Sequence, residues 1–422
     1  MLAKRPATPP APRRLTHKLG TSYVSFGAPY RARHRAGLSH DMDEPKKRHN
    51  HDTHAMPPQA ICNAYKKYQQ MDEGNLLSDP EIVDFGRGLS DAQKEKLLPV
   101  GIVSSEMIAS AQEAFMAHDD DCNTESQPAS PEPCTIYEHR DFPGKSTVLE
   151  IDIKLLTSIT GLRVFPSLLP PECQVMFVDR LMHRELSNPL HMTNIHHDYN
   201  IPFPQPDSDG ERPSFFKYPQ SGKHQSLTPL NPHSNHKPLN MAQFLQKKLR
   251  WLTIGDQYNW QTRSYPMVSP TLFPKDISAL VTSLFENSFT PESGVVLLYS
   301  AKDYMPVHRD VSEECERGLA SFSLGCDGLF IIAHDKYPDE DEGNDEREQE
   351  MVVIRVRSGD VVQMAGPTRF SWHAMPRIIA GTYPQWLENW PVNSKNGPRE
   401  YERWRGYMKG KRLNISCRQV WT

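Results

Sequence analysis

The chain has 422 residues, 37% of them hydrophobic, and a formal net charge of −4 at pH 7. This length suffices for two or three domains with a large core, and the charge balance excludes a generic polyanion binder, so any nucleic-acid contact needs local basic patches. Its seven cysteines show no CxxC pair, which favours reduced thiols in an intracellular protein, and no run of about eighteen apolar residues predicts a membrane span.

Residues 1–57 are predicted to form a disordered basic arm, because they are rich in Pro, Arg and His. Eight Lys or Arg and no acidic residue precede Asp41, which is typical of mitochondrial transit peptides and of disordered basic arms. Prolines within residues 6–12 disfavour the amphipathic helix of a transit peptide, but the sequence does not decide between a transit peptide and a disordered arm. We expect the protein in the nucleus, the mitochondrion or both.

Residues 58–134 are predicted to be a helical extension that ends in a linker. QAICNAYKKYQQ (59–70) suits one short helix. DPEIVDFG (79–86) resembles a docking segment more than a core element. Residues 117–133, which contain DDD and PASPEP, are typical of a linker.

Residues 135–246 are predicted to be an N-terminal extension of the following domain, with a long loop. In 161–186, a strand precedes an amphipathic helix that begins at a Pro-Pro pair. Residues 188–240 are rich in Pro, His, Ser and Asn. Because so long a structureless connection is uncommon, we expect it to be disordered or a functional surface loop.

Residues 247–422 are predicted to form an all-β core with flanking helices, as a double-sheet jelly roll. LRWLTIG (249–255) suits a strand, and Pro274 begins a helix with an apolar stripe at Ile277, Leu280, Val281, Leu284 and Phe285. Further strands are expected at 294–300, 319–325, 328–333, 351–357, 360–364, 368–373 and 412–420, and a helix at 399–409. The acidic run 335–350 is interpreted as a solvated hairpin tip.

GVVLLYSAKDYMPVHRD (294–310) combines a strand with candidate metal ligands. His308 and Asp310 are two positions apart, so an extended chain points both side chains to one face. The later segment SWHAMPR offers His373 as a second imidazole. Two histidines and one carboxylate form the facial triad that holds non-haem Fe(II) with open coordination positions.

The His-x-acid spacing alone carries little weight, because about two matches are expected by chance in a chain of this composition. Four further pairs occur: His118/Asp120, His139/Asp141, His183/Glu185 and His196/Asp198. Three of them lie in linkers or polar loops, and the pair within the expected helix of 161–186 does not share a helix face. We interpret all four as residues without a metal-binding role.

RLNISCR is a strand candidate in which two side-chain classes alternate. The polar class is Arg412, Asn414, Ser416 and Arg418, and the apolar class is Leu413, Ile415 and Cys417. The alternation predicts a half-buried strand that aims two guanidiniums and two hydrogen-bonding side chains into one cavity. Buried arginines are costly without an anion, so the pattern favours an anionic ligand; the alternative is pairing with buried Asp or Glu.

Four segments together resemble the AlkB family of Fe(II)/2-oxoglutarate dioxygenases: GVVLLYSAKDYMPVHRD, LASFSLGCDGLFIIA, SGDVVQMAGPTRFSWHAMPRI and RLNISCRQV. RWLTIGDQYNW, FPKDI and EYERW narrow the resemblance to the eukaryotic branch named AlkB homologue one. It is close over 247–422 and weaker in 59–100 and 135–185. The resemblance implies a double-stranded β-helix (jelly roll) that encloses iron and co-substrate.

The resemblance also implies roles for individual residues. The iron ligands are matched by His308, Asp310 and His373, and the 2-oxoglutarate site by Tyr299, Arg412, Asn414, Ser416 and Arg418. Arg412 matches the arginine that pairs with the distal carboxylate, and Arg418 the second arginine, nearer the iron.

Two positions depart from the family pattern. Ser416 stands where Thr is usual and keeps the hydroxyl, whereas Leu297 stands where the family has Asn. The second change removes one hydrogen bond to the co-substrate, which contributes only about 0.5–1.5 kcal/mol. We expect weaker co-substrate binding without loss of activity.

By resemblance, the chain is expected to use Fe(II), 2-oxoglutarate and O₂ to remove N-methyl groups from bases of DNA or tRNA, with formaldehyde and succinate as products. Alternatives are a protein (histone) demethylase and a catalytically silent nucleic-acid-binding module; we expect a monomer without membrane contact. Candidate base-clamp residues are Tyr258, Trp260, Tyr265 and Trp372, and candidate phosphate contacts are Lys247, Lys248, Arg250, Arg263, Arg369 and Arg377.

Overall fold

The computed structural model describes residues 53–117, 130–140, 161–208, 210, 212–222, 225–266, 271–285, 288–333, 351–394 and 399–421. Most of the predicted arm, most of the predicted linker and the acidic run 335–350 lie outside these residues. In the described part, no helix has both the length and the apolar character that crossing a membrane requires.

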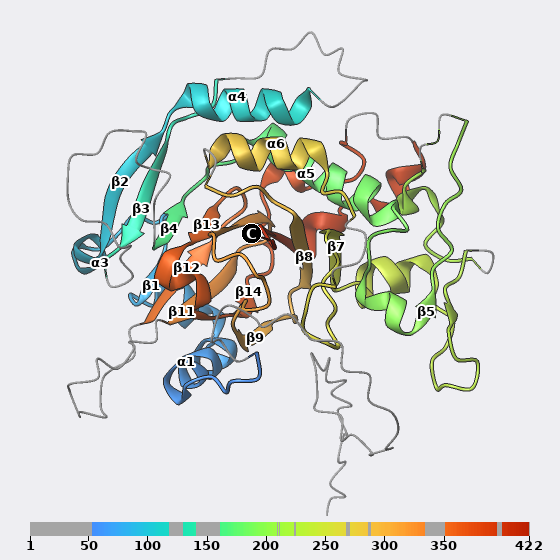
Figure 1. Ribbon diagram of the computed structural model, residues 1–422, viewed down its shortest axis with the longest axis horizontal. Coiled ribbons are helices and arrows are strands. Elements are labelled where there is room, and N and C mark those ends of the chain that lie inside the picture. The colour runs from blue at the N-terminus through green and yellow to red at the C-terminus, as the bar shows by residue number, and fades with distance from the viewer. Residues whose placement is uncertain are drawn as a thin grey trace, which may run out of the picture. The chain divides into compact units, whose positions relative to one another are not determined.

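Two large β-sheets dominate the described residues (Figure 1). From edge to edge, the larger contains β2 (Leu97–Val103), β3 (Cys134–His139), β4 (Leu162–Phe165), β13 (Val361–Met364), β10 (Leu319–Gly325), β15 (Lys411–Arg418), β8 (Ser293–Ser300) and β7 (Trp251–Gly255). The smaller contains β1 (Ile82–Val83), β12 (Met351–Val356), β11 (Gly328–Ala333), β14 (Trp372–Ile378) and β9 (Met305–His308). A short pair, β5 (Tyr199–Asn200) and β6 (Thr228–Pro229), stands apart.

From β8 onward the chain alternates between the two large sheets, except that β11 and β12 form a pair within the smaller one. β8, β10, β13 and β15 belong to the larger sheet, whereas β9, β11, β12 and β14 belong to the smaller one. Their pairings within each sheet are antiparallel. This alternation is the double-stranded β-helix, so the predicted jelly roll with flanking helices is confirmed.

Helices cover the outer faces of both sheets (Figure 1). The helices are α1 (Gln59–Gln70), α2 (Glu73–Ser78), α3 (Asp91–Lys96), α4 (Ser105–Met116), α5 (Pro171–Asp179) and α6 (Lys275–Leu284). α4, α5 and α6 share one core cluster with the larger sheet, for example through Phe177 and Phe322, whose ring centroids are 5.7 Å apart. α1 packs on the smaller sheet, where Ile61 meets Ile331 in a second cluster.

Several shorter helical turns complete the chain. They lie at Arg180–Arg184 and Gln243–Lys248 (π-helical) and at Glu185–Ser187, Asn194–His197, Phe215–Lys217, Gly366–Phe370, Gln385–Leu387, Arg399–Trp404 and Tyr407–Gly410 (3-10). The helix expected at 399–409 is therefore two 3-10 turns, interrupted at Gly406, whose φ of 79° lies in the left-handed region that suits glycine. The strand expected at 368–373 is likewise wrong at its start, because a 3-10 turn occupies Gly366–Phe370 and β14 begins at Trp372.

Two sequence interpretations of burial need correction. Residues 188–240 include buried Phe215, Phe216 and Leu227, which pack into the main core cluster, so the described part of this connection is neither disordered nor only a surface loop. β15 is buried on both faces rather than half-buried, because Ile415 and its apolar neighbours face the helix-covered core. The polar alternation marks the inner face of a two-layer fold, not a solvent face.

The segment 79–86 adds a strand to the edge of the smaller sheet, and Ile82 belongs to a hydrophobic core cluster, so the expectation of a docking segment more than a core element is wrong about the core. Within it, β1 pairs in parallel with β12, and Ile82 and Val83 are buried. Asp84 follows, with a side chain only 1% exposed, and its carboxylate accepts from Arg357 Nη2 at 2.6 Å. The domain boundaries expected at 134 and 246 stay predictions; β2–β4 share a sheet with the later strands.

Asp84→Ala is expected to lower the free energy of unfolding by about 3–5 kcal/mol, because it leaves the charges of Arg355 and Arg357 with one carboxylate fewer in a buried network. Burial opposes ionisation of Asp84, but Arg357 and Arg355 hold its pKa below the ordinary value. Its contribution is therefore present at neutral pH and lost as the pH falls below about 3.9. Urea unfolding at pH 7 and pH 3 measures both effects; Asp91→Ala, at an exposed ion pair, should change stability by less than about 1 kcal/mol.

Candidate metal centre

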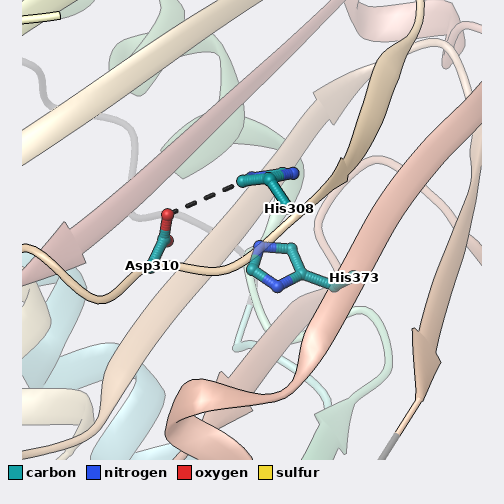
Figure 2. Close-up of side chains that lie close together, drawn as sticks. All are labelled: His308, Asp310 and His373. Atoms are coloured by element: carbon teal, nitrogen blue, oxygen red, sulfur yellow. Dashed lines mark ion pairs between the residues drawn. The ribbon is translucent and has the colours of Figure 1, made fainter. Parts of the chain in front are cut away.

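Three candidate metal ligands meet between the two sheets (Figure 2). His308 ends β9, Asp310 follows two residues later, and His373 lies on β14, which pairs with β9. The two imidazoles are register partners, with ring centroids 4.3 Å apart. One potential ligand atom from each of the three residues lies within 4.8 Å of the others, and His308 Nε2 is 4.0 Å from Asp310 Oδ1.

Hydrogen bonds to the backbone fix the tautomer of both imidazoles. His308 Nδ1 lies 2.8 Å from Pro306 O, and His373 Nδ1 lies 3.0 Å from Ser371 O. A carbonyl oxygen only accepts, so each Nδ1 must carry the hydrogen. In the neutral ring, each Nε2 then has a free lone pair for a metal ion, and the carbonyl orients the ring.

The charge states of His373 and Asp310 suit a divalent cation. Burial and the neighbouring His308 lower the pKa of His373 to about 4, so this imidazole is neutral at physiological pH. Burial opposes ionisation of Asp310, but the positive charge of Arg418 and the nearby imidazoles hold its pKa below the ordinary value. Asp310 therefore offers a carboxylate, and His373 offers a neutral nitrogen donor.

Arg418 at the end of β15 connects Asp310 to a second buried carboxylate, Glu313. Its Nη1 lies 3.1 Å from Asp310 Oδ2 and 2.8 Å from Glu313 Oε1. Burial disfavours the charge of Arg418, but Asp310 and Glu313 hold its pKa well above the ordinary value. Arg418 thus pairs with acidic residues, which was the alternative to an anionic ligand. Arg369 joins the same network, because its guanidinium lies 2.9 Å from Glu313 Oε2.

Arg412, at the other end of β15, has no carboxylate partner in the described part of the chain. Its guanidinium is fully buried and donates to Cys326 O at 3.2 Å and to Ser323 Oγ at 2.8 Å. Among the described residues, no carboxylate oxygen lies within 4.0 Å of its nitrogens. Burial lowers its pKa, which expresses the cost of keeping this charge away from water.

The other predicted co-substrate residues lie on β15 and on its neighbour β8. Tyr299 on β8 is the register partner of Arg412, and burial raises the pKa of its phenol, which stays protonated. Asn414 Nδ2 donates to Ser321 Oγ on β10 at 2.8 Å, and Ser416 Oγ lies 3.4 Å from the same oxygen. The structure thus places seven of the eight predicted site residues on strands of the two large sheets, and Asp310 two residues beyond the end of β9.

The residues fit an iron ion with a dianionic chelator. Two neutral imidazoles and one carboxylate form the set that non-haem Fe(II) accepts with positions left open. Arg412 Nε and Arg418 Nε are buried N–H groups without a hydrogen-bond partner in the described part of the chain. An unpaired buried donor on a cation is costly, and a carboxylate ligand would remove that cost.

Three of the four candidate base-clamp aromatics, Tyr258, Trp260 and Tyr265, form one contiguous group near Asp310. Tyr258 contacts Trp260 and Tyr265, with ring centroids 5.0 Å and 5.2 Å apart. Its hydroxyl lies 3.4 Å from Ser312 Oγ, two residues beyond Asp310. Trp372 is buried and carries the guanidinium of Arg309 over its ring at 4.4 Å.

Most of the candidate phosphate contacts are engaged elsewhere. Arg369 is fully buried with Glu313, so its expected role as a phosphate contact is wrong. Arg250 pairs with Asp303 at 3.2 Å, Arg263 donates to Thr53 O at 2.5 Å, and Arg377 donates to Met71 O. Lys247 and Lys248 are exposed and stay available for a polyanion.

The remaining His-x-acid pairs do not assemble metal sites within the described ranges. The ring of His183 is stacked between Trp390 and Tyr401, with centroids 5.0 Å and 4.8 Å away. His196 Nδ1 instead accepts from Thr193 N at 2.9 Å. His118, Asp120 and Asp141 lie outside the described residues.

Sequence reasoning missed Glu313 and misplaced Arg369. Both lie in connections between strands, Glu313 in the acidic run Glu313, Glu314 and Glu316, and no periodic pattern distinguishes them from solvated charges. The one available signal for Glu313 was its position three residues after Asp310 in a segment free of basic residues.

The chain was compared with known families and proteins. The profile of the 2OG-Fe(II) oxygenase superfamily matches residues 161–418. A protein of Pyricularia oryzae named N6-methyladenosine RNA demethylase ALKB1 is 34% identical over 379 residues, which cover 87% of this chain and 97% of that protein. The tRNA demethylase abh1 of Schizosaccharomyces pombe is 29% identical over 62% of this chain and 79% of its own. The solved structure of OsALKBH1 covers 66% of this chain and 100% of its own, with 17% identity and a TM-score of 0.35.

The family profile spans more than half of the chain and includes every predicted ligand and co-substrate residue. The similarity to the Pyricularia oryzae protein extends over nearly that whole protein. Family, relatives and fold agree with the resemblance carried by the motifs. The chain therefore belongs to the 2OG-Fe(II) oxygenase superfamily, and within it to the AlkB family, close to AlkB homologue one.

Proposed function

We propose that this protein is an Fe(II)- and 2-oxoglutarate-dependent demethylase of N-methylated bases in RNA or DNA. The observation that carries the proposal is the convergence of the His308, Asp310 and His373 donors with Arg412, a buried cation without a carboxylate partner among the described residues. The three donor residues suit a metal ion, and the buried cation suits an anionic chelator of that ion.

Within this proposal, His308, Asp310 and His373 hold Fe(II), and Arg412 binds the distal carboxylate of 2-oxoglutarate. Arg412 Nε, unpartnered in the described structure, is the donor offered to that carboxylate. Tyr299, its register partner, contributes a protonated phenol as a further donor. Arg418 Nε is the corresponding donor at the metal end of β15.

The iron and co-substrate, when bound, supply the oxidising power, and the protein supplies orientation and a site shielded from water. In the overall reaction, O₂, 2-oxoglutarate and an N-methyl group give succinate, CO₂, formaldehyde and the demethylated nitrogen. One oxygen atom enters succinate and the other leaves in formaldehyde. No residue of the chain needs to act as a nucleophile or change its charge.

A base in nucleic acid must leave its stack to reach such a buried centre. Tyr258 and Trp260 offer aromatic faces close to Ser312, and the exposed Lys247 and Lys248 offer charge for phosphates. The names of the relatives from Pyricularia oryzae and Schizosaccharomyces pombe, an RNA and a tRNA demethylase, support RNA as the first substrate to examine.

The proposal is tested with a panel of methylated substrates incubated with protein, Fe(II) and 2-oxoglutarate. Oligonucleotides of RNA and DNA that carry N6-methyladenine, N1-methyladenine or N3-methylcytosine are compared with a methyl-lysine histone peptide. We expect at least one oligonucleotide to release formaldehyde and to raise succinate formation above the rate without nucleic acid. Release from the peptide alone would replace the proposal by a protein demethylase, and release from no substrate would support a silent binding module.

Tyr258→Ala is expected to lower kcat/KM for the methylated oligonucleotide about 5- to 100-fold, because one base–aromatic contact is worth about 1–3 kcal/mol. The slow turnover of 2-oxoglutarate without nucleic acid should stay within about twofold of the wild-type rate, since Tyr258 is not among the metal or co-substrate residues. Parallel succinate assays with and without oligonucleotide measure both. Equal losses in the two assays would indicate a structural role for Tyr258.

A further inference from the structure

Glu313 is a second carboxylate beside the candidate metal centre. Its side chain is only 2% exposed. Oε1 accepts from Arg418 Nη1 at 2.8 Å, and Oε2 accepts from Arg369 Nη2 at 2.9 Å. Each oxygen thus serves a different guanidinium, and neither faces solvent.

Arg369 connects the two segments that carry the candidate metal ligands. It lies in the turn that leads to His373, and its Nη1 donates to the backbone oxygen of Asp310 at 2.8 Å. Glu313 is the carboxylate paired with this fully buried guanidinium in the described structure. Without Glu313, the charge of Arg369 would be uncompensated.

Arg418 has two carboxylates within reach. Its Nη1 lies closer to Glu313 Oε1, at 2.8 Å, than to Asp310 Oδ2, at 3.1 Å. The other oxygen of Asp310 faces His308. A guanidinium favours two parallel N–H bonds to one carboxylate, so loss of Glu313 would allow Arg418 to turn onto Asp310 and engage both of its oxygens.

We propose that Glu313 is a positioning residue: it keeps Arg418 from binding both oxygens of Asp310, and so preserves one Asp310 oxygen for the metal and Arg418 Nε for the co-substrate. The inference rests on the proposed function, since it requires a metal held by Asp310. Charge balance supports it, because Asp310 and Glu313 together match the two charges of Arg369 and Arg418.

Mn(II) binding to the full-length protein tests the proposal without any turnover. Free Mn(II) is measured by electron paramagnetic resonance during titration of the wild type, Glu313→Gln and Glu316→Gln. We expect Glu313→Gln to bind about 10- to 100-fold more weakly, the cost typical of losing an outer-shell partner. Glu316→Gln, an exposed residue of the same loop, should match the wild type. Wild-type affinity in Glu313→Gln would overturn the proposal.

A double-mutant cycle separates positioning from a direct effect on the metal. If Glu313 acts through Arg418, Glu313→Gln should change Mn(II) affinity by less than about twofold in an Arg418→Met background. An equal loss in both backgrounds would overturn the proposal, because the effect would then not need Arg418.

Two further comparisons keep the result unambiguous. If circular dichroism shows that Glu313→Gln does not fold, Glu313→Asp replaces it. The shorter side chain of Asp should make Mn(II) binding weaker than in the wild type. An unchanged Mn(II) affinity in Glu313→Asp would overturn the proposal. Failure of the wild type itself to bind Mn(II) would overturn the proposed function. If the wild type and Glu313→Gln bind Mn(II) with the same affinity, only the positioning role of Glu313 is overturned, and the proposed function stands.

Discussion

Asp310→Ala is expected to stop iron-dependent consumption of 2-oxoglutarate, with a loss larger than the roughly 10- to 100-fold typical of outer-shell changes. Asp310 is the single carboxylate of the triad, and its Oδ1 lies 4.0 Å from His308 Nε2. Its removal leaves the two imidazoles as ligands and leaves Glu313 as the carboxylate that pairs with both Arg418 and Arg369, so the site gains positive charge. A divalent cation then loses its anionic ligand and meets a repulsive charge.

The chain provides its own matched control for this experiment. His196 and Asp198 repeat the His-x-Asp spacing, but Asp198 is half-exposed and lies 3.7 Å from His236 rather than in the triad. Asp198→Ala should keep at least half of the wild-type rate in the same succinate assay. Substantial turnover in Asp310→Ala, or an equal loss in Asp198→Ala, would remove the triad from the account.

Arg412→Met is expected to weaken 2-oxoglutarate binding strongly while leaving the ligand-free fold as stable as before or more stable. Loss of one partner from a buried, hydrogen-bonded charge pair costs about 2–5 kcal/mol, which corresponds to a KM for 2-oxoglutarate about 30- to 4,000-fold higher. In the ligand-free protein, the guanidinium of Arg412 is buried without a carboxylate partner among the described residues, and replacing such a charge by an apolar side chain is neutral or stabilising.

Arg355→Met is the control for the combination of a raised KM for 2-oxoglutarate and an unchanged stability. Arg355 is also buried, but its Nη2 lies 2.7 Å from Asp327 Oδ2, and its Nη1 is 3.4 Å from Asp84. Its loss should destabilise the protein by about 3–5 kcal/mol in urea unfolding, because it strips a partner from buried carboxylates. If Arg412→Met lost stability to the same degree and kept its KM, Arg412 would be a structural residue.

The grouping of the three candidate metal ligands was predictable because its signal combines spacing with strand pattern, whereas the roles of the site residues stay a prediction. His308 and Asp310 follow a strand, and the polar alternation from Arg412 to Arg418 identifies one face of another. Which face meets solvent was not predictable, since the same alternation suits a half-exposed strand and an inner face opposite a second sheet. Only the placement of α4, α5 and α6 over the apolar side decides between them.

The environment of each charge was not predictable either. Arg412 and Arg418 are equivalent in the pattern, yet Arg418 pairs with Asp310 and Glu313 while Arg412 has no described acidic partner. Arg369 carries no sign of burial in its neighbourhood, although it is 0% exposed. Long-range contacts decide these cases, and they depend on which loops meet after the sheets have formed.

Anaerobic equilibrium dialysis of Fe(II) against the wild type and His373→Ala, with 2-oxoglutarate present, examines the assembled centre most directly. His373 comes from a strand far along the chain, and it reaches the other two donors only if β14 and β9 pair as described. The account predicts about one Fe(II) bound per wild-type chain and a far weaker interaction in the variant. Equal Fe(II) binding by both proteins would mean that these side chains do not form the metal centre.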